Sequence, residues 1–175
     1  LFSPDGQRLL TLAWNRTARV WDANSGQALT PPISHGALLR GAAFSPDGNR
    51  LATGAADGSV RVWWTATGEP AAGPLSQRGA VIDLQFSPDG ATLATAGEDA
   101  TVMVWDLREG RARLGPLRHD SWVNSVRFSP DGRRLLTASA DHSARLWDVA
   151  TGRESAAPMV HGQAVVSARF SPDGG

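Results

Sequence analysis

The string Phe-Ser-Pro-Asp-Gly occurs five times in this chain, beginning at Phe2, Phe44, Phe86, Phe128 and Phe170. Successive copies are 42 residues apart, and a constant period of this length is typical of tandem supersecondary units that stack on their neighbours. Three other residue types keep the same phase, namely Trp21, Trp63, Trp105 and Trp147; Gly26, Gly68, Gly110 and Gly152; and Pro32, Pro74, Pro116 and Pro158. The sequence therefore predicts a repeat array rather than a domain with one unique core.

Each period predicts four short strands and no helix, because prolines and glycines interrupt any 3.6-residue pattern. In the third complete period the expected strands are Trp122 to Phe128, Arg134 to Ser139, Ser143 to Val149, and about Glu154 to Val160. The apolar spacing in the first of these predicts a β-bulge just before Val126. Pro158 lies in the fourth strand, and proline lacks the N–H that a central strand donates, so this strand is expected at the sheet edge. The unit is a four-stranded antiparallel meander.

A Trp-Asp dipeptide ends the third expected strand at Trp21-Asp22, Trp105-Asp106 and Trp147-Asp148, whereas the second copy reads Trp63-Trp64. With these motifs the chain resembles the WD40 family, in the form of bacterial-type tandem repeats. The resemblance implies an all-β propeller of four-stranded antiparallel blades, with about four blades' worth in residues 1–175. The expected units are residues 1–35 (first strand missing), 36–77, 78–119, 120–161, and 162–175 (first strand of the next blade). We expect the chain to be a fragment of a larger propeller.

The resemblance also implies a structural relay in each blade, in which His, Ser or Thr, Asp and Trp side chains hydrogen-bond in series. The positions that match it are His35, Thr53, Asp57 and Trp63; Gln77, Thr95, Asp99 and Trp105; His119, Thr137, Asp141 and Trp147; Thr11, Asn15 and Trp21 in the first blade; and His161 at the other end. A buried Trp N–H needs an acceptor and a buried Asp needs donors, and such a relay supplies both.

The alternative for these residues is a Ser/His/Asp hydrolase or a His/Asp metal site, since Asp120 and Ser121 follow His119. The nucleophile elbow Gly-x-Ser-x-Gly is absent, and the histidines fall in different repeats. The lack of lysine excludes a P-loop. We therefore expect no enzyme, no cofactor and no metal. Asn15-Arg16-Thr17 matches the glycosylation sequon, but Asn15 occupies the relay Asp position and is expected to face inward.

Charge and composition limit the classes of partner and the cellular location that we expect. The 17 basic residues balance the 17 acidic ones, which argues against nucleic acid and membrane surfaces. All of the basic residues are arginine, which indicates a GC-rich, bacterial genome. Cysteine is absent, no apolar run approaches the roughly 18 residues of a membrane span, and the N-terminus is unlike a signal peptide. We expect a cytoplasmic location.

Partner contacts in the resembling family come from loop positions around one face of the propeller. The matching positions that are not merely small are Trp14, Leu38, Arg40, Ile82, Glu98, Trp122 and Asn124. Trp and Arg are enriched in binding hot spots. Trp64 replaces a usually acidic residue, and either packing on the outer strand or a rim contact accounts for it.

The resulting prediction is a non-catalytic protein-binding or scaffold module of a larger bacterial signalling protein, whose ligand is a protein or peptide. The alternatives are a regulatory or substrate-binding propeller of a kinase- or ATPase-linked enzyme, and a purely architectural spacer. The first blade lacks its innermost strand, while Ala164 to Phe170 is a spare one. Closure within one chain predicts four blades, and closure between two chains predicts eight. In the natural protein we expect further repeats to complete the ring, with seven or more blades. For these 175 residues alone we expect self-association, or aggregation, rather than an open monomer.

Overall fold

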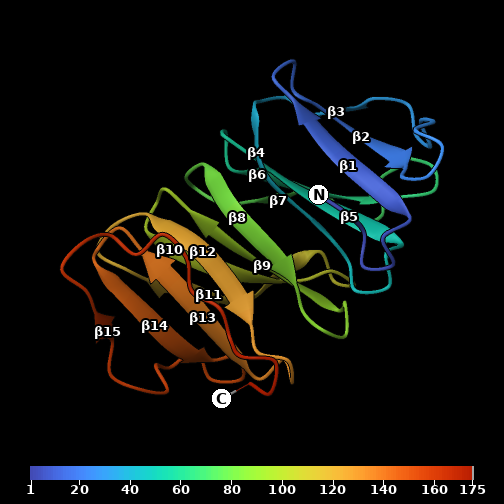
Figure 1. Cartoon of the computed structure of the whole chain (residues 1–175). Coiled ribbons are helices and arrows are strands. Elements are labelled where there is room, and N and C mark those ends of the chain that lie inside the picture. Colours follow the sequence, from blue (N-terminus) through green and yellow to red (C-terminus); the bar gives the residue numbers. More distant parts are fainter. Residues whose placement is uncertain (175) are drawn as a thin grey trace.

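The computed structural model describes residues 1–174 and shows four antiparallel β-sheets that follow one another along the chain in a curved row (Figure 1). The fold is all-β, as the sequence predicts, and the described residues contain no helix. Consequently no helix in this part of the chain could cross a membrane.

The first sheet has three strands and the others have four, each in the order of the sequence. The first sheet consists of β1 (Arg8–Ala13), β2 (Thr17–Asp22) and β3 (Ile33–Ser34). The second consists of β4 (Leu39–Phe44), β5 (Arg50–Ala55), β6 (Ser59–Trp64) and β7 (Leu75–Ser76). The third consists of β8 (Val81–Phe86), β9 (Thr92–Gly97), β10 (Thr101–Asp106) and β11 (Arg111–Arg118). The fourth consists of β12 (Val123–Phe128), β13 (Arg134–Ser139), β14 (Ser143–Asp148) and β15 (Met159–Val160).

The Phe-Ser-Pro-Asp-Gly string forms the turn between the first and second strands of a sheet. In the second sheet, the Gly48 N–H donates to Ser45 O at 2.9 Å, and Gly48 has a φ of 69° that favours glycine. The Ser45 hydroxyl donates to Asp47 Oδ1 at 2.5 Å and accepts the Arg50 N–H at 2.9 Å. The serine hydroxyl and the aspartate carboxylate of the turn thus bond to each other and to nearby backbone groups, which explains why these residue types recur together.

Arginines at the start of the second strands join neighbouring sheets. Arg8 donates to Gly48 O at 2.7 Å, Arg50 to Gly90 O at 2.8 Å, and Arg134 to Gly174 O at 2.5 Å. Each guanidinium therefore binds the turn of the next period. The remaining copy carries Thr92 at this position.

The expected β-bulge is confirmed. The β12–β13 register shifts between Val123 and Ser125, and the equivalent shifts occur at the start of β4 and β8. The extra residue in each case is Asn124, Arg40 or Ile82, because it stands between the two paired positions. A bulge bends the strand and re-aims this side chain.

The fourth strand lies at the sheet edge, as expected, but it is shorter than predicted in three of the four sheets. β15 covers only Met159–Val160, with a separate bridge between Trp147 and Glu154. The intervening segment contains Pro158, which cannot donate a ladder hydrogen bond. Only β11 runs without interruption, over eight residues.

Apolar side chains fill the space between successive sheets. Val81, Leu84 and Phe86 of β8, for example, pack with Ala52 and Val62 of the preceding sheet. The innermost strands β4, β8 and β12 lie next to one another in this packing, and β8 also contacts β5. The row of sheets is consequently one continuous stack, and it positions the loops at the strand ends along a common face.

The two ends of the row differ from its middle. β5, β9 and β13 each lie between two strands, but β1 pairs along its length with β2 alone. At the other end, residues 164–170 follow β15 without forming a strand ladder. The division into units 1–35, 36–77, 78–119, 120–161 and 162–175 remains a prediction.

Candidate functional site

The fourth sheet contains a continuous chain of side-chain hydrogen bonds. The Trp147 indole N–H donates to Thr137 Oγ1 at 2.9 Å, and Thr137 Oγ1 lies 2.7 Å from His119 Nε2. His119 Nδ1 lies 2.8 Å from Asp141 Oδ2. Because an ionised carboxylate only accepts, Nδ1 carries the proton and Nε2 accepts the threonine hydroxyl. All four predicted residues of this relay therefore lie in contact, inside a blade rather than in an open cleft.

The charge states in this relay follow from burial and hydrogen bonding. Burial lowers the pKa of His119 below its ordinary value, although Asp141 opposes this. For Asp141, burial would raise the pKa, but hydrogen bonds from Ser143, the Asp120 N–H and His119 hold that pKa well below its usual range. The relay at neutral pH is therefore a neutral imidazole on an ionised carboxylate.

In the third sheet, a glutamine takes the place of the histidine, and the donors and acceptors follow one another in the same order. Thr95 Oγ1 accepts the Trp105 indole N–H at 2.9 Å and donates to Gln77 Oε1 at 2.6 Å. Gln77 Nε2 donates to Asp99 Oδ1 at 2.9 Å. An amide oxygen thus replaces Nε2 and an amide N–H replaces Nδ1, so this relay contains no imidazole.

The second sheet contains an incomplete relay. Trp63 donates to Thr53 Oγ1 at 2.9 Å, but His35 Nδ1 lies 3.3 Å from Ser59 Oγ, which itself donates to Asp57 Oδ1 at 2.5 Å. His35 Nε2 is buried without a hydrogen-bond partner. Burial lowers the pKa of His35, and the nearby Arg61 lowers it further.

The relay of the first sheet lacks a histidine altogether. Trp21 donates to Thr11 Oγ1 at 2.8 Å, and Thr17 donates to Asn15 Oδ1 at 2.7 Å. Contrary to the prediction, Asn15 does not face inward; it is exposed because no innermost strand covers this end of the row. His161 is also exposed, and its backbone N–H donates to His142 O at 2.8 Å. The structure thus leaves Thr11 and His161 apart.

The predicted partner positions lie at one end of the sheets, in loops and at the starts of innermost strands. Trp14 is 88% exposed and Trp122 is 54% exposed. Arg40 is exposed, whereas Leu38, Ile82, Glu98 and Asn124 are half-buried. Asn124 Nδ2 donates to Val165 O at 3.0 Å and so anchors the C-terminal segment. Trp64, 44% exposed, ends β6 and therefore lies at the opposite end of its sheet.

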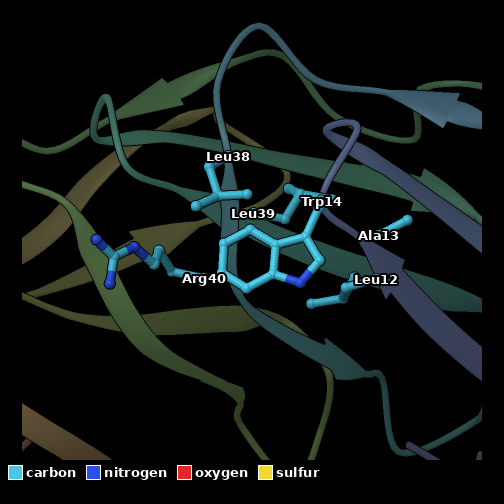
Figure 2. Close-up of a pocket in the computed structure, with 6 residues that line it drawn as sticks. All are labelled: Leu12, Ala13, Trp14, Leu38, Leu39 and Arg40. Atoms are coloured by element: carbon cyan, nitrogen blue, oxygen red, sulfur yellow. The ribbon is translucent and has the colours of Figure 1, made fainter.

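Trp14 stands beside a hollow at the junction of the first two sheets. Figure 2 shows its indole between the Leu38 and Leu39 side chains and that of Leu12, with the Arg40 guanidinium extending away from it. The hollow has a volume of about 270 Å³ and is lined by Leu12, Ala13, Trp14, Leu38, Leu39 and Arg40. Within residues 1–174, Arg40 makes no ion pair.

The repeat shows how this junction differs from the next one. Gly54, Ala96 and Ala138 are the counterparts of Leu12 one, two and three periods later. The next junction is so tight that a Cβ on Gly54 would lie 2.5 Å from Val81 Cγ1. The first junction, in contrast, accommodates a leucine that is 40% exposed. Leu12 is therefore larger than its counterparts in the other repeats. Trp14 is also an exception, because the residues at its position in the later repeats are Ala56, Glu98 and Ala140.

An ion pair between half-buried side chains of the third and fourth sheets was not predicted from the sequence. Asp83 Oδ2 lies 2.5 Å from Arg127 Nη1 and accepts the Val126 N–H at 3.0 Å. The sequence did contain a signal for this pair, because Asp83 and Arg127 carry opposite charges at nearby positions of two consecutive innermost strands. Neither these side chains nor any others in the described part of the chain form a group of three or more potential metal ligands.

The comparisons with known proteins agree with this architecture. The family model described as "WD domain, G-beta repeat" matches residues 1–22, 29–63, 73–106 and 113–148. The chain belongs to the WD40 family. No curated protein sequence matches it. Among solved structures, it resembles the crystal structure of the computationally designed Ika8 protein, with 26% identity and a TM-score of 0.84.

The match to Ika8 covers 94% of this WD40 chain and 50% of the designed chain. The chain therefore spans about half the length of that protein. WD40 repeats are protein-interaction modules, and this membership accounts for the four β-meanders found in the structure. The relays of the second, third and fourth sheets are interior features, so the loop face with Trp14 is the surface on which a binding site can be sought.

Proposed function

We propose that this chain is a non-catalytic module that binds a protein or peptide on the loop face around Trp14. The observation that supports it best is an 88% exposed tryptophan beside the hollow between β1 and β4. Exposed aromatic side chains that can enter or cover a pocket are frequent hot spots of interfaces. Catalysis by residues of the innermost strands is the alternative function. It has less support, because the charged side chains Asp83 and Arg127 on these strands form an ion pair with each other.

The chemistry of the hollow favours a ligand segment with an apolar side chain next to a carboxylate. Leu12, Trp14 and Leu38 supply apolar walls, and Arg40 supplies a guanidinium with no internal ion pair. A guanidinium can bind a carboxylate through two parallel hydrogen bonds. Glu98 in the third sheet and Trp122 in the fourth lie at equivalent loop positions, so the same face continues along the row.

The wider role that we propose is a scaffold in a larger bacterial signalling protein in the cytoplasm. The exclusive use of arginine among the basic residues supports a bacterial origin, and the resemblance to bacterial tandem WD40 arrays supports the signalling role. A propeller attached to a kinase or ATPase is a variant of this proposal, and an architectural spacer is its competitor.

The test compares Trp14→Ala and Arg40→Ala with Trp64→Ala, an exposed tryptophan at the other end of the sheet. Partners are first identified by affinity capture from the source organism, and their affinity is then measured by calorimetry. We expect a loss of at least 10-fold for Trp14→Ala and no change for Trp64→Ala, since hot-spot truncations cost about 2 kcal/mol or more. Equal affinities for all variants would contradict this site, and the absence of any specific partner would favour a spacer.

We also propose self-association of this chain at the open edge of the first sheet. β1 exposes Thr11, Leu12 and Ala13, whereas the corresponding residues of β5, β9 and β13 are buried. An exposed strand edge is a template for pairing with another chain. Association of copies at this edge would cover it.

A further inference from the structure

We propose that a second hollow, between the second and third sheets, binds a phosphorylated serine or threonine side chain of a peptide. In this site Arg78 and Arg118 bind the phosphate group, and Asp99 accepts a hydrogen bond from the backbone of the same peptide. The inference goes beyond the Trp14 site, because it concerns other residues and a ligand of different chemistry.

The second hollow lies in the middle of the row, where β7 and β11 end. Its volume is about 630 Å³, compared with about 270 Å³ for the hollow beside Trp14. The lining comes from the end of β7 and the loop after it, from the start of β10 with the loop before it, and from the end of β11. Pockets of roughly 300–1,000 Å³ hold organic ligands, so this hollow has room for a peptide side chain and its flanking backbone.

Arg78 and Arg118 both line this hollow. Both residues are exposed, and within residues 1–174 neither side chain forms an ion pair. A guanidinium binds two phosphate oxygens at once, and two guanidinium groups match the charge of about −1.5 to −2 on a phosphate monoester at neutral pH. The pair therefore favours a phosphate over a single carboxylate.

The backbone holds both arginines in place. Arg78 directly follows Gln77, and Arg118 directly precedes His119, which are buried residues of two relays. Arg118 also pairs with Thr101 in the ladder between β10 and β11. Binding groups on such fixed segments lose little backbone freedom when a ligand binds, which favours affinity.

The equivalent region of the fourth sheet contains ion pairs of the chain itself. Arg145 lies there with its guanidinium 3.0 Å from Glu154 Oε1, 3.6 Å from Asp120 Oδ2 and 3.6 Å from Asp141 Oδ2. The charge of this arginine is consequently balanced by carboxylates of its own blade.

The third sheet keeps only the aspartate of this group. The residues one period before Arg145, Glu154, Asp120 and Val160 are Met103, Ala112, Arg78 and Arg118. A neutral thioether thus replaces the central arginine, and two arginines flank it at positions that are acidic or apolar in the fourth sheet. Asp99 is the one carboxylate in the lining of the hollow, so the positive charge there is not balanced within the chain.

Asp99 provides the acceptor for the ligand's backbone. Its Oδ1 accepts the Gln77 Nε2–H at 2.9 Å, the Thr101 N–H at 3.1 Å and the Thr101 hydroxyl at 2.8 Å. Its Oδ2 accepts no hydrogen bond within the described residues, whereas Asp141 Oδ2 accepts from His119 and from a backbone N–H. A carboxylate repels a bare anion but accepts a peptide N–H. The hollow should therefore bind a phosphate on a peptide more tightly than inorganic phosphate.

The first experiment measures fluorescence anisotropy with two pools of labelled heptapeptides. One pool has a central phosphoserine, the other has a central serine, and all remaining positions are random. We expect the apparent dissociation constant to be at least about 10-fold lower for the phosphoserine pool, because charged hydrogen bonds to both arginines require the phosphate. Equal constants for the two pools would overturn the proposal.

The second experiment locates the contact by substitution. Arg78→Ala and Arg118→Ala should each weaken binding of the phosphoserine pool about 10-fold. Arg113→Ala removes an exposed arginine from the same strand β11, outside the hollow, and should leave the affinity unchanged. All three side chains are exposed, so folding should be unaffected. An equal loss in Arg113→Ala would show general attraction to the basic strand and would overturn the site.

The same pool separates this site from the proposed one. Trp14→Ala should leave the affinity for the phosphoserine pool unchanged, and a loss in this variant would overturn the assignment to the second hollow. Inorganic phosphate serves as a competitor. It should displace the labelled pool only at concentrations at least about 10-fold above those needed with the unlabelled phosphoserine pool, since it makes no backbone contact with Asp99. Displacement at equal concentrations would overturn the peptide as the ligand.

Discussion

His119 Nδ1 lies 2.8 Å from Asp141 Oδ2, and both side chains are almost completely inaccessible to solvent. Asp141 also accepts two hydrogen bonds from Ser143 and one from the Asp120 N–H. Removal of this carboxylate leaves several buried donors without a partner, so that Asp141→Ala should lower the free energy of unfolding by about 1–3 kcal/mol. Asp57→Ala should cost less, because Asp57 makes no direct bond to His35. Urea denaturation compares the two, and a larger loss at Asp57 would contradict the assigned contacts.

Stability should fall in mildly acidic solution. Burial lowers the pKa of His119 and of His35 in the folded chain, whereas the unfolded chain titrates near 6.5. As the pH decreases below about 6.5, the unfolded chain binds protons that the folded chain does not, and the free energy of unfolding decreases. Above that pH the full stability is present.

The glutamine relay provides the matching substitution. His119→Gln should reduce the slope of stability against pH between about 6.5 and 5, because Gln77 shows that an amide satisfies the same partners. His142→Asn is the control, since His142 is exposed and asparagine tolerates its φ of 71°. Chemical denaturation over a pH series provides the measurement, and parallel slopes in both variants would refute the assignment.

Two glycines with similar backbone angles should respond differently to alanine. Gly58 has a φ of +81°, and a Cβ there would lie 2.1 Å from Gln77 O. Gly26 has a φ of +69° with nothing within 4 Å. Gly26→Ala should cost only the left-handed conformation, about 1–2 kcal/mol, while Gly58→Ala should cost clearly more because a backbone oxygen must move. Thermal unfolding measures both variants, and an equal loss of stability in the two would contradict the tight packing at Gly58.

The two partners of the ion pair between the third and fourth sheets should contribute unequally to the free energy of unfolding. Asp83→Ala removes the acceptor of both Arg127 and the Val126 N–H, and we expect a loss of about 1–3 kcal/mol. Arg127→Ala should cost less than about 1 kcal/mol, because partly exposed pairs contribute little and Asp83 keeps its backbone donor. Equilibrium unfolding of both variants and the double variant measures the difference. A larger cost at Arg127 would show that its own packing dominates.

The period and the turn chemistry were sufficient to predict the fold. A proline and a glycine in each turn, and a tryptophan at the same place in each third strand, constrain every blade locally, so that strand order and the bulge before Val126 followed from the sequence. The short fourth strands did not, because their length depends on how far a proline-containing edge can follow its neighbour.

The relay positions could be listed from the sequence, but their geometry could not. His35 and His119 have the same phase, yet only His119 forms hydrogen bonds to both its threonine and its aspartate. The hollow beside Trp14 likewise depends on how the first two sheets meet. The Asp83–Arg127 pair joins two blades, and reasoning within a single repeat does not relate residues of different blades.

The arginines that bind the glycine carbonyl of the following turn have a consequence for the gene. Each contact links positions 40 residues apart in the chain, as with Arg8 and Gly48, and it refers to the neighbouring period rather than to a fixed partner. A duplication or deletion of 42 codons in register therefore leaves each of these arginines facing the glycine of a following turn. Unequal recombination can lengthen or shorten such an array in a single step, and these arginines would then bind whichever period comes next.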